Sequence, residues 1–278
     1  IKQNNPEFVD LSVEQILKDL KLYVNGKLTY AALILLGKKD IIRKYLPQAQ
    51  IVWEFRNTMS QTHSDTKVVV DEPLFKSLDE VWKLINQPNL NIKHPIQSGA
   101  YVFDVYTFNE KVIREALLNA VAHRDYTIKS EVVIKQYPNL IKIVNPGGFP
   151  RGVTLENLVT VSSTPRCRLM TEILEKTGLV ERSGQGVDRI FSITLSEGKS
   201  EPDYSQSDIY QVTLELDSKV KYKAFHIFVR NYALSGKEPK LGVEQIITLF
   251  KIQKGLFNSL NPSIVSSLEM AGLIKRVA

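Results

Sequence analysis

Two repeating patterns of apolar residues predict alternating helices and strands along the chain. Over 110–122, apolar side chains recur every three or four positions, which places them on one face of a helix. Elsewhere, short runs rich in β-branched and aromatic residues are typical of strands. Helices are predicted at 11–22, 78–86, 110–122, between Thr164-Pro165 and Gly178, between Gly186 and Gly198, and at 222–233, 242–251 and 262–271. Strands are predicted at 51–56, 67–70, 101–106, 131–136, 140–144 and 209–216.

Capping and turn residues set the expected ends of several of these elements. Ser77 and Asn109 are predicted N-caps of the helices that follow them. Thr164-Pro165 combines a cap with a proline at the first helical position, and Gly178 lies where that helix should stop. Pro138-Asn139 forms a turn between two strands, which predicts an antiparallel pair.

Changes in pattern divide the chain into three segments. The Pro- and Asn-containing run 87–95 breaks a helix, so the first segment is placed at 1–100 and the second at 101–217. In the third segment, 218–278, three short helices precede the apolar run LIKRV at 273–277. Three short helices and a strand are typical of a winged helix–turn–helix.

Composition narrows the expected environment and partners. The 278 residues include 36 Lys and Arg against 30 Asp and Glu, with a pI of about 9.1. This excess favours polyanionic partners only weakly, because many basic proteins bind no nucleic acid. The single cysteine, Cys167, excludes an intramolecular disulfide and fits a reducing compartment.

The chain shows no sign of a membrane or zinc protein. Its longest apolar run, 31–36, is too short to cross a bilayer, and no signal peptide is visible. Its four scattered histidines lack the spacing of zinc ligands. We therefore expect a cytoplasmic protein without a membrane partner. Because the chain begins with Ile1, we also expect it to be a fragment of a longer protein.

A glutamate and an asparagine on the helix at 110–122 are candidates for nucleotide chemistry. Glu115 and Asn119 are four residues apart, so their side chains leave the same helix face one turn apart. A carboxylate can orient or deprotonate water, and an amide oxygen can supply one ligand to Mg²⁺. A solvated helix face is the alternative explanation of this pair.

Two glycine-containing loops follow this helix in the chain. A predicted strand ends in Asn145-Pro146-Gly147-Gly148, and Ser183-Gly184-Gln185-Gly186 immediately precedes a helix. Glycines at a helix N-terminus let backbone N–H groups close on a phosphate, and the helix dipole favours the anion. An ordinary turn and a backbone cap are the alternatives.

Two arginines are expected at the start of a further helix. Cations in the first turn oppose the helix dipole, so Arg166 and Arg168 are mildly disfavoured there by chance. Beside a phosphate, the same side chains and the exposed N–H groups would form an anion site. Solvated arginines are the alternative.

Three stretches together resemble the GHKL family of ATPases and kinases. They are REALLNAVAHRDY at 114–126, NPGGFP at 145–150 and ERSGQGVDRI at 181–190. They resemble most the RecG-like, Schlafen-AlbA-associated branch, whose members are described as predicted transcriptional regulators. NGKLTYAALILLGK at 25–38 resembles the end of the AlbA-type domain that precedes this region. The resemblance implies a two-layer α/β sandwich with a mixed, largely antiparallel sheet, preceded by an AlbA-like α/β segment and followed by a winged helix.

The resemblance also implies roles for individual residues. Glu115 would be the catalytic base and Asn119 the Mg²⁺ ligand in a site for ATP or a related nucleotide. The remaining cofactor-binding residues would be Asn145, Gly147 and Gly148 at the base and Gly184 and Gly186 at the phosphates. Arg166, from the anion site described above, completes the candidate set. His123 lies one turn after Asn119 and would border the pocket, unless it is a packed or capping histidine.

One position departs from the GHKL pattern, which has aspartate where Asn145 stands. A carboxylate accepts the adenine amino group through a charge-assisted hydrogen bond, whereas an amide can accept or donate. We expect weaker or less adenine-selective binding, by about 1–2 kcal/mol.

Missing motifs exclude two classes of enzyme, the protein kinases and the helicases. His123-Arg124-Asp125 resembles part of a protein-kinase loop, but Ser130 stands where that loop requires asparagine, and no DFG occurs. A local ion pair is expected for Arg124 and Asp125 instead. No GxxxxGK[ST] motif is present, so the chain is not a helicase motor.

The predicted winged helix is a candidate for DNA binding. Its third helix, 262–271, would enter the major groove, with Lys275-Arg276 at the start of the wing. That helix carries Glu269 and no Lys or Arg, so a role in dimer or domain contacts is the alternative.

The sequence therefore supports three hypotheses. In the first, nucleotide occupancy biases the flanking DNA-binding modules of a transcriptional regulator. In the second, the chain is a slow Mg²⁺-dependent ATPase with Glu115 as general base. In the third, a degenerate ATPase fold binds no nucleotide and serves as a homodimerising scaffold.

Overall fold

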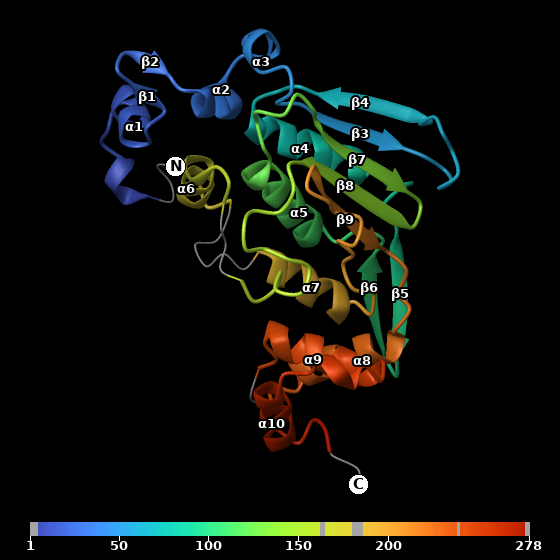
Figure 1. Cartoon of the computed structure of the whole chain (residues 1–278). Coiled ribbons are helices and arrows are strands. Elements are labelled where there is room, and N and C mark those ends of the chain that lie inside the picture. The colour runs from blue at the N-terminus through green and yellow to red at the C-terminus, as the bar shows by residue number, and fades with distance from the viewer. Residues whose placement is uncertain (1–4, 162–164, 180–185, 238–239, 276–278) are drawn as a thin grey trace.

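A five-stranded mixed sheet forms the centre of the protein (Figure 1). The computed structural model describes residues 5–161, 165–179, 186–237 and 240–275. In the order of the sheet, the strands are β4 (Thr66–Val70), β3 (Ile51–Phe55), β7 (Val132–Tyr137), β8 (Leu140–Pro146) and β9 (Gln211–Asp217). β3 and β7 are parallel, whereas the other three pairs are antiparallel. The chain is thus a mixed α/β protein, and its sheet is largely antiparallel as predicted.

Two helices cover one face of this sheet. They are α4 (Leu74–Ile85) and α5 (Glu110–His123), which lie on the same side of the strands (Figure 1). The register places one buried residue of each central strand on this face, and the row they form continues in β9. These residues are Trp53, Ile134, Ile143 and Leu214. Burial of this row against α4 and α5 forms the main core.

The N-terminal segment joins the same core. Its elements are η2 (Pro6–Phe8), α1 (Val13–Asp19), β1 (Tyr23–Val24), β2 (Lys27–Leu28), α2 (Tyr30–Leu36) and α3 (Lys39–Tyr45). Ala32 and Leu35 of α2 are buried in the main cluster of apolar side chains. The sheet itself extends across the boundary expected near residue 100, because β3 pairs with β7 and β4 pairs with β3. The division into domains stays a prediction.

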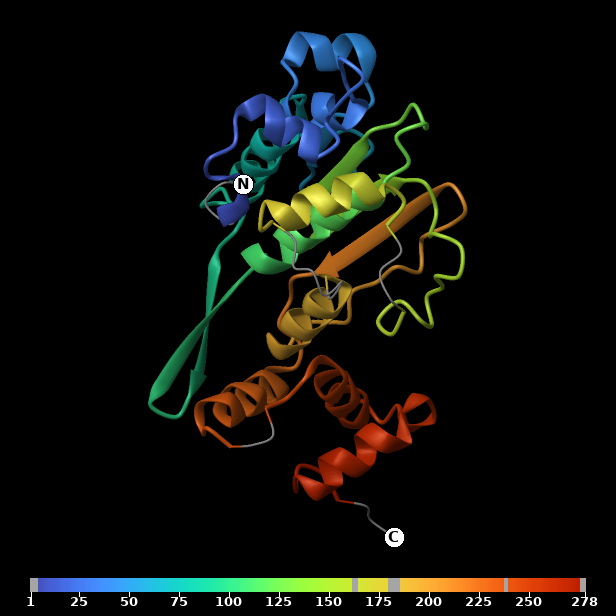
Figure 2. The same cartoon turned by 90° about the vertical axis from the view of Figure 1, so that its left-hand side faces the viewer.

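A separate two-stranded ribbon projects from the sheet layer. It consists of β5 (Lys93–Ser98) and β6 (Tyr101–Tyr106), of which only β6 was expected from the sequence. Figure 2 shows the ribbon reaching the C-terminal helices. At that end Phe103 packs edge-on against His226, and the guanidinium of Arg230 lies over its ring.

The C-terminal segment has its own small core. It consists of α8 (Lys223–Leu234), α9 (Val243–Gln253), η3 (Phe257–Ser259) and α10 (Pro262–Met270). The three predicted helices are therefore present. Leu273–Lys275 form no strand, and the rest of the predicted wing lies outside the described residues. None of the described helices is long and apolar enough to cross a membrane.

Two predicted helix starts are wrong. α4 begins at Leu74, directly after the N-cap residue Pro73, and Leu74 is buried. Ser77 lies inside this helix, and its hydroxyl donates to the carbonyl of Glu72. α6 (Arg168–Lys176) begins three residues after Pro165. Its predicted end is confirmed by Gly178, which has a φ of +74°.

The last helix of the central region, α7 (Gly186–Ser196), packs against α5 on one side and α9 on the other. A polar network fixes the far end of α7 to the start of α5. Asn109 caps α5 by accepting from Lys111, and its amide donates to the carboxylate of Glu197. The buried ammonium of Lys199 bonds the same carboxylate and the carbonyl of Tyr106. This network fixes the position of the C-terminal end of α7 relative to the N-terminal end of α5.

Candidate functional site

The first residue of α7 lies directly against the two candidate side chains of α5. A Cβ placed on Gly186 would be 2.3 Å from Oε1 of Glu115 and 3.0 Å from Nδ2 of Asn119. A side chain at this position would therefore collide with Glu115 unless the carboxylate moved, and it would press tightly against Asn119. The structure brings together two stretches that are some 70 positions apart in the chain. Gly184, also expected at the phosphates, lies outside the described residues.

Helical geometry accounts for the direction of Glu115 and Asn119. Ala116, Leu117 and Ala120 are buried in the main core, which fixes the rotation of α5. Glu115 and Asn119 occupy the adjacent face, where α7 packs, and Glu115 is only 5% exposed. A carboxylate so deeply buried requires polar partners.

Arg189 supplies one of these partners, and sequence reasoning missed it. Its Nη1 lies 3.5 Å from Oε2 of Glu115. Arg189 follows Gly186 by three residues and thus belongs to the first turn of α7. The available signal was the unfavourable position of a cation in a first helical turn. That signal was applied to Arg166 and Arg168 but not to Arg189.

Two buried amide atoms on this side of the sheet lack hydrogen-bond partners among the described residues. They are Nδ2 of Asn119 and Oδ1 of Asn145, a donor and an acceptor. Asn145 is 5% exposed and lies on β8, on the face that packs against α5. Each unpaired buried group costs roughly 1–3 kcal/mol. A polar ligand between these elements would satisfy both.

The corner after β8 requires its two glycines for packing. Gly147 has a φ of +95°, and a Cβ there would be 2.9 Å from Cβ of Asp125. A Cβ on Gly148 would be 2.5 Å from the carbonyl oxygen of Asp208. Asp125 also donates its backbone N–H to the carbonyl of Pro146 at 2.9 Å. The corner is therefore packed tightly onto the end of α5.

Arg166 holds this corner from the other side. Its Nη2 donates to the carbonyl of Gly148 at 2.7 Å, and its Nη1 lies 3.5 Å from Oδ2 of Asp125. It precedes α6 and does not belong to the first helical turn, contrary to expectation. Arg168 is exposed and pairs with Glu172 on the same helix, as expected of a solvated arginine.

His123, at the end of α5, lies close to this arginine. Burial lowers the pKa of His123 below its ordinary value, and the positive charge of Arg166 lowers it further. The imidazole is thus held neutral near pH 7. A neutral imidazole can both donate and accept a hydrogen bond.

The expected ion pair between Arg124 and Asp125 is wrong. The guanidinium of Arg124 is buried and donates to the backbone carbonyls of Gln48 and Ser130. Asp125 pairs with Arg166 instead. The pair is separated because Arg124 is the C-cap residue of α5, where its side chain turns into the protein.

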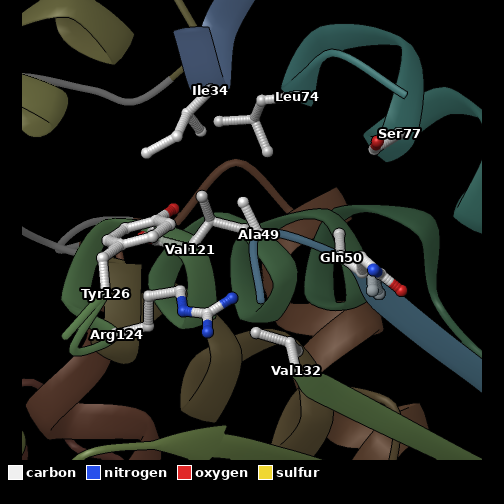
Figure 3. Close-up of a pocket in the computed structure, with 10 residues that line it drawn as sticks. Ile34, Ala49, Gln50, Leu74, Ser77, Val121, Arg124, Tyr126 and Val132 are labelled. Carbon is white, nitrogen blue, oxygen red and sulfur yellow. Dashed lines mark hydrogen bonds between the residues drawn. The ribbon is translucent and has the colours of Figure 1, made fainter. Parts of the chain in front are cut away.

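A small cavity borders Arg124 on the side of α5 that faces the N-terminal segment. Figure 3 shows it between α2, α4 and α5, lined by side chains such as Ile34, Leu74 and Val121. It has room for about one water molecule. It is therefore too small for a nucleotide and does not belong to the candidate site.

Comparison with known families covers two parts of the chain. Residues 129–216 match an ATPase family described as "Putative ATP-dependent DNA helicase recG C-terminal". Residues 1–52 match a domain of unknown function (DUF8451). The first match includes Asn145, Arg166 and Gly186 but begins after α5. The comparison with curated proteins gives no match.

A crystal structure of the DIP2311 protein from Corynebacterium diphtheriae is similar in fold. The TM-score is 0.74 at 19% sequence identity, and the similarity covers 97% of this chain. It covers 55% of that chain, so the protein described here spans about half the length of its structural relative. At this identity the similarity concerns the fold alone.

The lowered pKa of His123 predicts a loss of stability in mild acid. The unfolded chain takes up a proton as the pH falls through the ordinary histidine value of 6.5, whereas the folded protein resists it. The free energy of unfolding should therefore decrease as the pH falls from about 7.5 through 6.5. Chemical denaturation between pH 7.5 and 5.5 should show a smaller decrease in His123→Gln.

The matched control is His63→Gln, an exposed histidine after β3. It should retain the pH dependence of the unaltered protein. Equal pH dependence in His123→Gln and the unaltered protein would contradict the assignment of a partly buried, neutral His123.

Proposed function

We propose that the central region binds ATP or a related nucleotide between α5, the corner after β8 and the first turn of α7. The observation that carries this proposal is the contact of Gly186 with Glu115 and Asn119. A glycine at a helix N-terminus leaves backbone N–H groups accessible to phosphate oxygens, and the helix dipole favours an anion there. The ATPase family matched by residues 129–216 supports a nucleotide as the ligand.

The side chains at this site suit a nucleotide that arrives with its metal. Among the described residues, no group of three or more His, Cys, Asp or Glu side chains could hold a metal ion. Mg²⁺ needs few protein ligands when phosphate oxygens supply the others. The amide of Asn119 would hold the ion together with the phosphates. Bound there, Mg²⁺ would neutralise phosphate charge.

The corner after β8 would contact the base. The buried Oδ1 of Asn145 has no partner among the described residues and would accept a hydrogen bond such as the amino group of adenine donates. This acceptor is neutral, so it selects adenine less strongly than the carboxylate usual in GHKL proteins. Close packing already accounts for the two glycines at 147 and 148. Their role would therefore be to position Asn145.

We further propose that the C-terminal segment binds DNA and responds to the nucleotide. Residues 218–278 hold ten of the 36 Lys and Arg but three of the 30 Asp and Glu. They therefore carry a net charge of +7, and the preceding 217 residues carry −1. Such a concentration of positive charge supports binding to a polyanion. On this basis the chain is a nucleotide-responsive DNA-binding regulator.

Two other functions remain to be distinguished from this one. Glu115 is buried beside the proposed phosphate position, so slow hydrolysis with this carboxylate as base is the alternative enzyme function. A homodimerising scaffold that binds no nucleotide is the other. It would leave the unpartnered amides of Asn119 and Asn145 unexplained.

Removal of the Asn119 amide should separate nucleotide binding from folding. Asn119→Ala eliminates an unsatisfied buried donor, so the ligand-free variant should be no less stable than the unaltered protein. At a hundredfold excess over Kd, Mg-ATP should stabilise the unaltered protein by about 2.7 kcal/mol. Less than half of this stabilisation should remain in Asn119→Ala, measured by denaturation with and without Mg-ATP.

The matched control is Asn231→Ala, an exposed asparagine on α8, which should keep the full effect of Mg-ATP. Full stabilisation in Asn119→Ala would refute its role at the phosphates. An unaltered protein that gains no stability from Mg-ATP would favour the scaffold.

Replacement of Asn145 by aspartate should sharpen base selectivity. We expect the unaltered protein to prefer ATP over GTP by less than about tenfold, and Asn145→Asp to raise this ratio by about tenfold through a charge-assisted hydrogen bond. Titration calorimetry with both nucleotides measures the ratio. Asn139→Asp, in the exposed turn before β8, should leave it unchanged. A strong adenine preference in the unaltered protein would count against the assigned role of Asn145.

Charge reversal in the C-terminal segment should weaken binding to DNA. Lys223→Glu with Lys275→Glu changes two exposed positions, and affinity for a 20-base-pair duplex should fall by about tenfold or more at low salt. The salt dependence of binding, measured by fluorescence anisotropy, should also become shallower. Lys38→Glu with Lys76→Glu makes the same change in net charge elsewhere on the surface. An equal loss in both double variants would remove the assignment to the C-terminal segment.

A further inference from the structure

We propose that Glu115 and Arg189 form an internal latch that the nucleotide phosphates must open. In the ligand-free protein, the carboxylate of Glu115 occupies the anion position at the start of α7. An arriving phosphate displaces the carboxylate from this position and takes over Arg189. This inference rests on the proposed nucleotide site and assigns to it a regulatory contact.

Both carboxylate oxygens of Glu115 face the first turn of α7. Oε1 lies against Gly186, and Oε2 lies 3.5 Å from Nη1 of Arg189. α7 spans eleven residues, and the N-terminal end of a helix carries a partial positive charge. A carboxylate is a common ligand of such an end, as phosphate is. Glu115 therefore occupies a position that suits a phosphate group.

The two side chains of the latch differ in their exposure to solvent. The side chain of Glu115 is 6% exposed, whereas that of Arg189 is 35% exposed. Arg189 can thus meet a ligand from solvent while Glu115 stays within the protein. Arginine binds phosphate and carboxylate through the same planar donors, so exchange of one anion for the other needs no new chemistry.

A carboxylate that moves away from Arg189 can gain a hydrogen bond from its own helix, α5. Nδ2 of Asn119 has no partner among the described residues and lies one turn from Glu115. Oε1 and Nδ2 both approach the same point above Gly186, at 2.3 and 3.0 Å. A small rotation of the carboxylate would let Asn119 donate to it. The displaced carboxylate would then be oriented by its own helix.

The latch makes a prediction that a purely catalytic Glu115 does not. If the carboxylate competes with phosphate, its neutralisation in Glu115→Gln should tighten binding of Mg-ATP by about tenfold, because both the competitor and its charge repulsion are removed. A base that acts only on water would leave the affinity nearly unchanged. Arg189→Gln should weaken binding of Mg-ATP by about tenfold.

The experiment measures Kd by titration calorimetry for Mg-ATP and for adenosine, which has no phosphate. Glu115→Gln and Arg189→Gln should change the Kd for Mg-ATP in opposite directions and leave that for adenosine unchanged. Glu110→Gln, on an exposed position of α5, is the matched control and should change neither. Thermal unfolding checks each variant, and the double variant Glu115→Gln/Arg189→Gln removes both charges of the pair together.

Three outcomes distinguish failure of the inference from failure of the proposed function. If Mg-ATP binds but Glu115→Gln binds it no tighter than the unaltered protein, the latch is refuted and the nucleotide site stands. The latch is also refuted, and the nucleotide site again stands, if removal of Arg189 has no effect on affinity. In that case Arg189→Gln binds Mg-ATP as tightly as the unaltered protein, and the double variant binds it as tightly as Glu115→Gln. If neither Mg-ATP nor adenosine binds to the folded, unaltered protein, the proposed function itself fails.

Discussion

The close approach of α7 to α5 is the constraint on which the site depends. It exists because Gly186 has no side chain, so the first turn of α7 can lie against Glu115 and Asn119. The approach is maintained at the other end of the two helices by the network of Asn109, Glu197 and Lys199. Since Lys199 is buried and its ammonium donates to backbone carbonyls as well, this end cannot shift without leaving a charge unpaired. The site thus lies where two rigid helices converge on a single glycine.

The position of α7 also explains how one ligand could influence a distant segment. Ile190 belongs to the main core, whereas Leu195, little more than one turn later, belongs to the core of α8, α9 and α10. A helix that is packed into two cores cannot move relative to one of them without disturbing the other. A ligand shifts such an arrangement only through its different affinities for the two positions of the helix. The proposed exchange of Glu115 for phosphate at the first turn of α7 would be a contact of this kind.

Much of the fold was predictable because its elements follow simple periodicities. The helix capped by Asn109 and the hairpin of β7 and β8 are found where the sequence places them. The sequence could not indicate that β3 and β4 join the later strands, since pairing across some 80 residues leaves no local pattern. It also missed β5, whose residues Lys93–Ser98 include a proline and alternate weakly. Helix starts failed where burial outweighed a serine cap, as at Ser77.

The sequence indicated the parts of the candidate site that appear as helical spacing or as glycine-containing loops. Glu115 and Asn119 share a face because they are four residues apart, and no tertiary information was needed for that. The contribution of Arg189 required the structure, because its significance lies in a contact across two helices. Arg166 was selected for a reason that proved wrong, yet it holds the corner beside Asn145 through Gly148.

The unpaired amides provide the strongest physical reason to expect a ligand. Folding normally satisfies buried polar groups, and each failure costs roughly 1–3 kcal/mol out of a small total stability. Of the other unpaired atoms, Nε of Arg124 and Nε2 of His226 belong to side chains that form hydrogen bonds through another atom, whereas Oγ1 of Thr213 on β9 also lacks a partner among the described residues. For Asn119 and Asn145, a donor and an acceptor are left on the same side of the sheet. A nucleotide carries acceptors on its phosphates and donors on its base, so a single ligand would satisfy both groups.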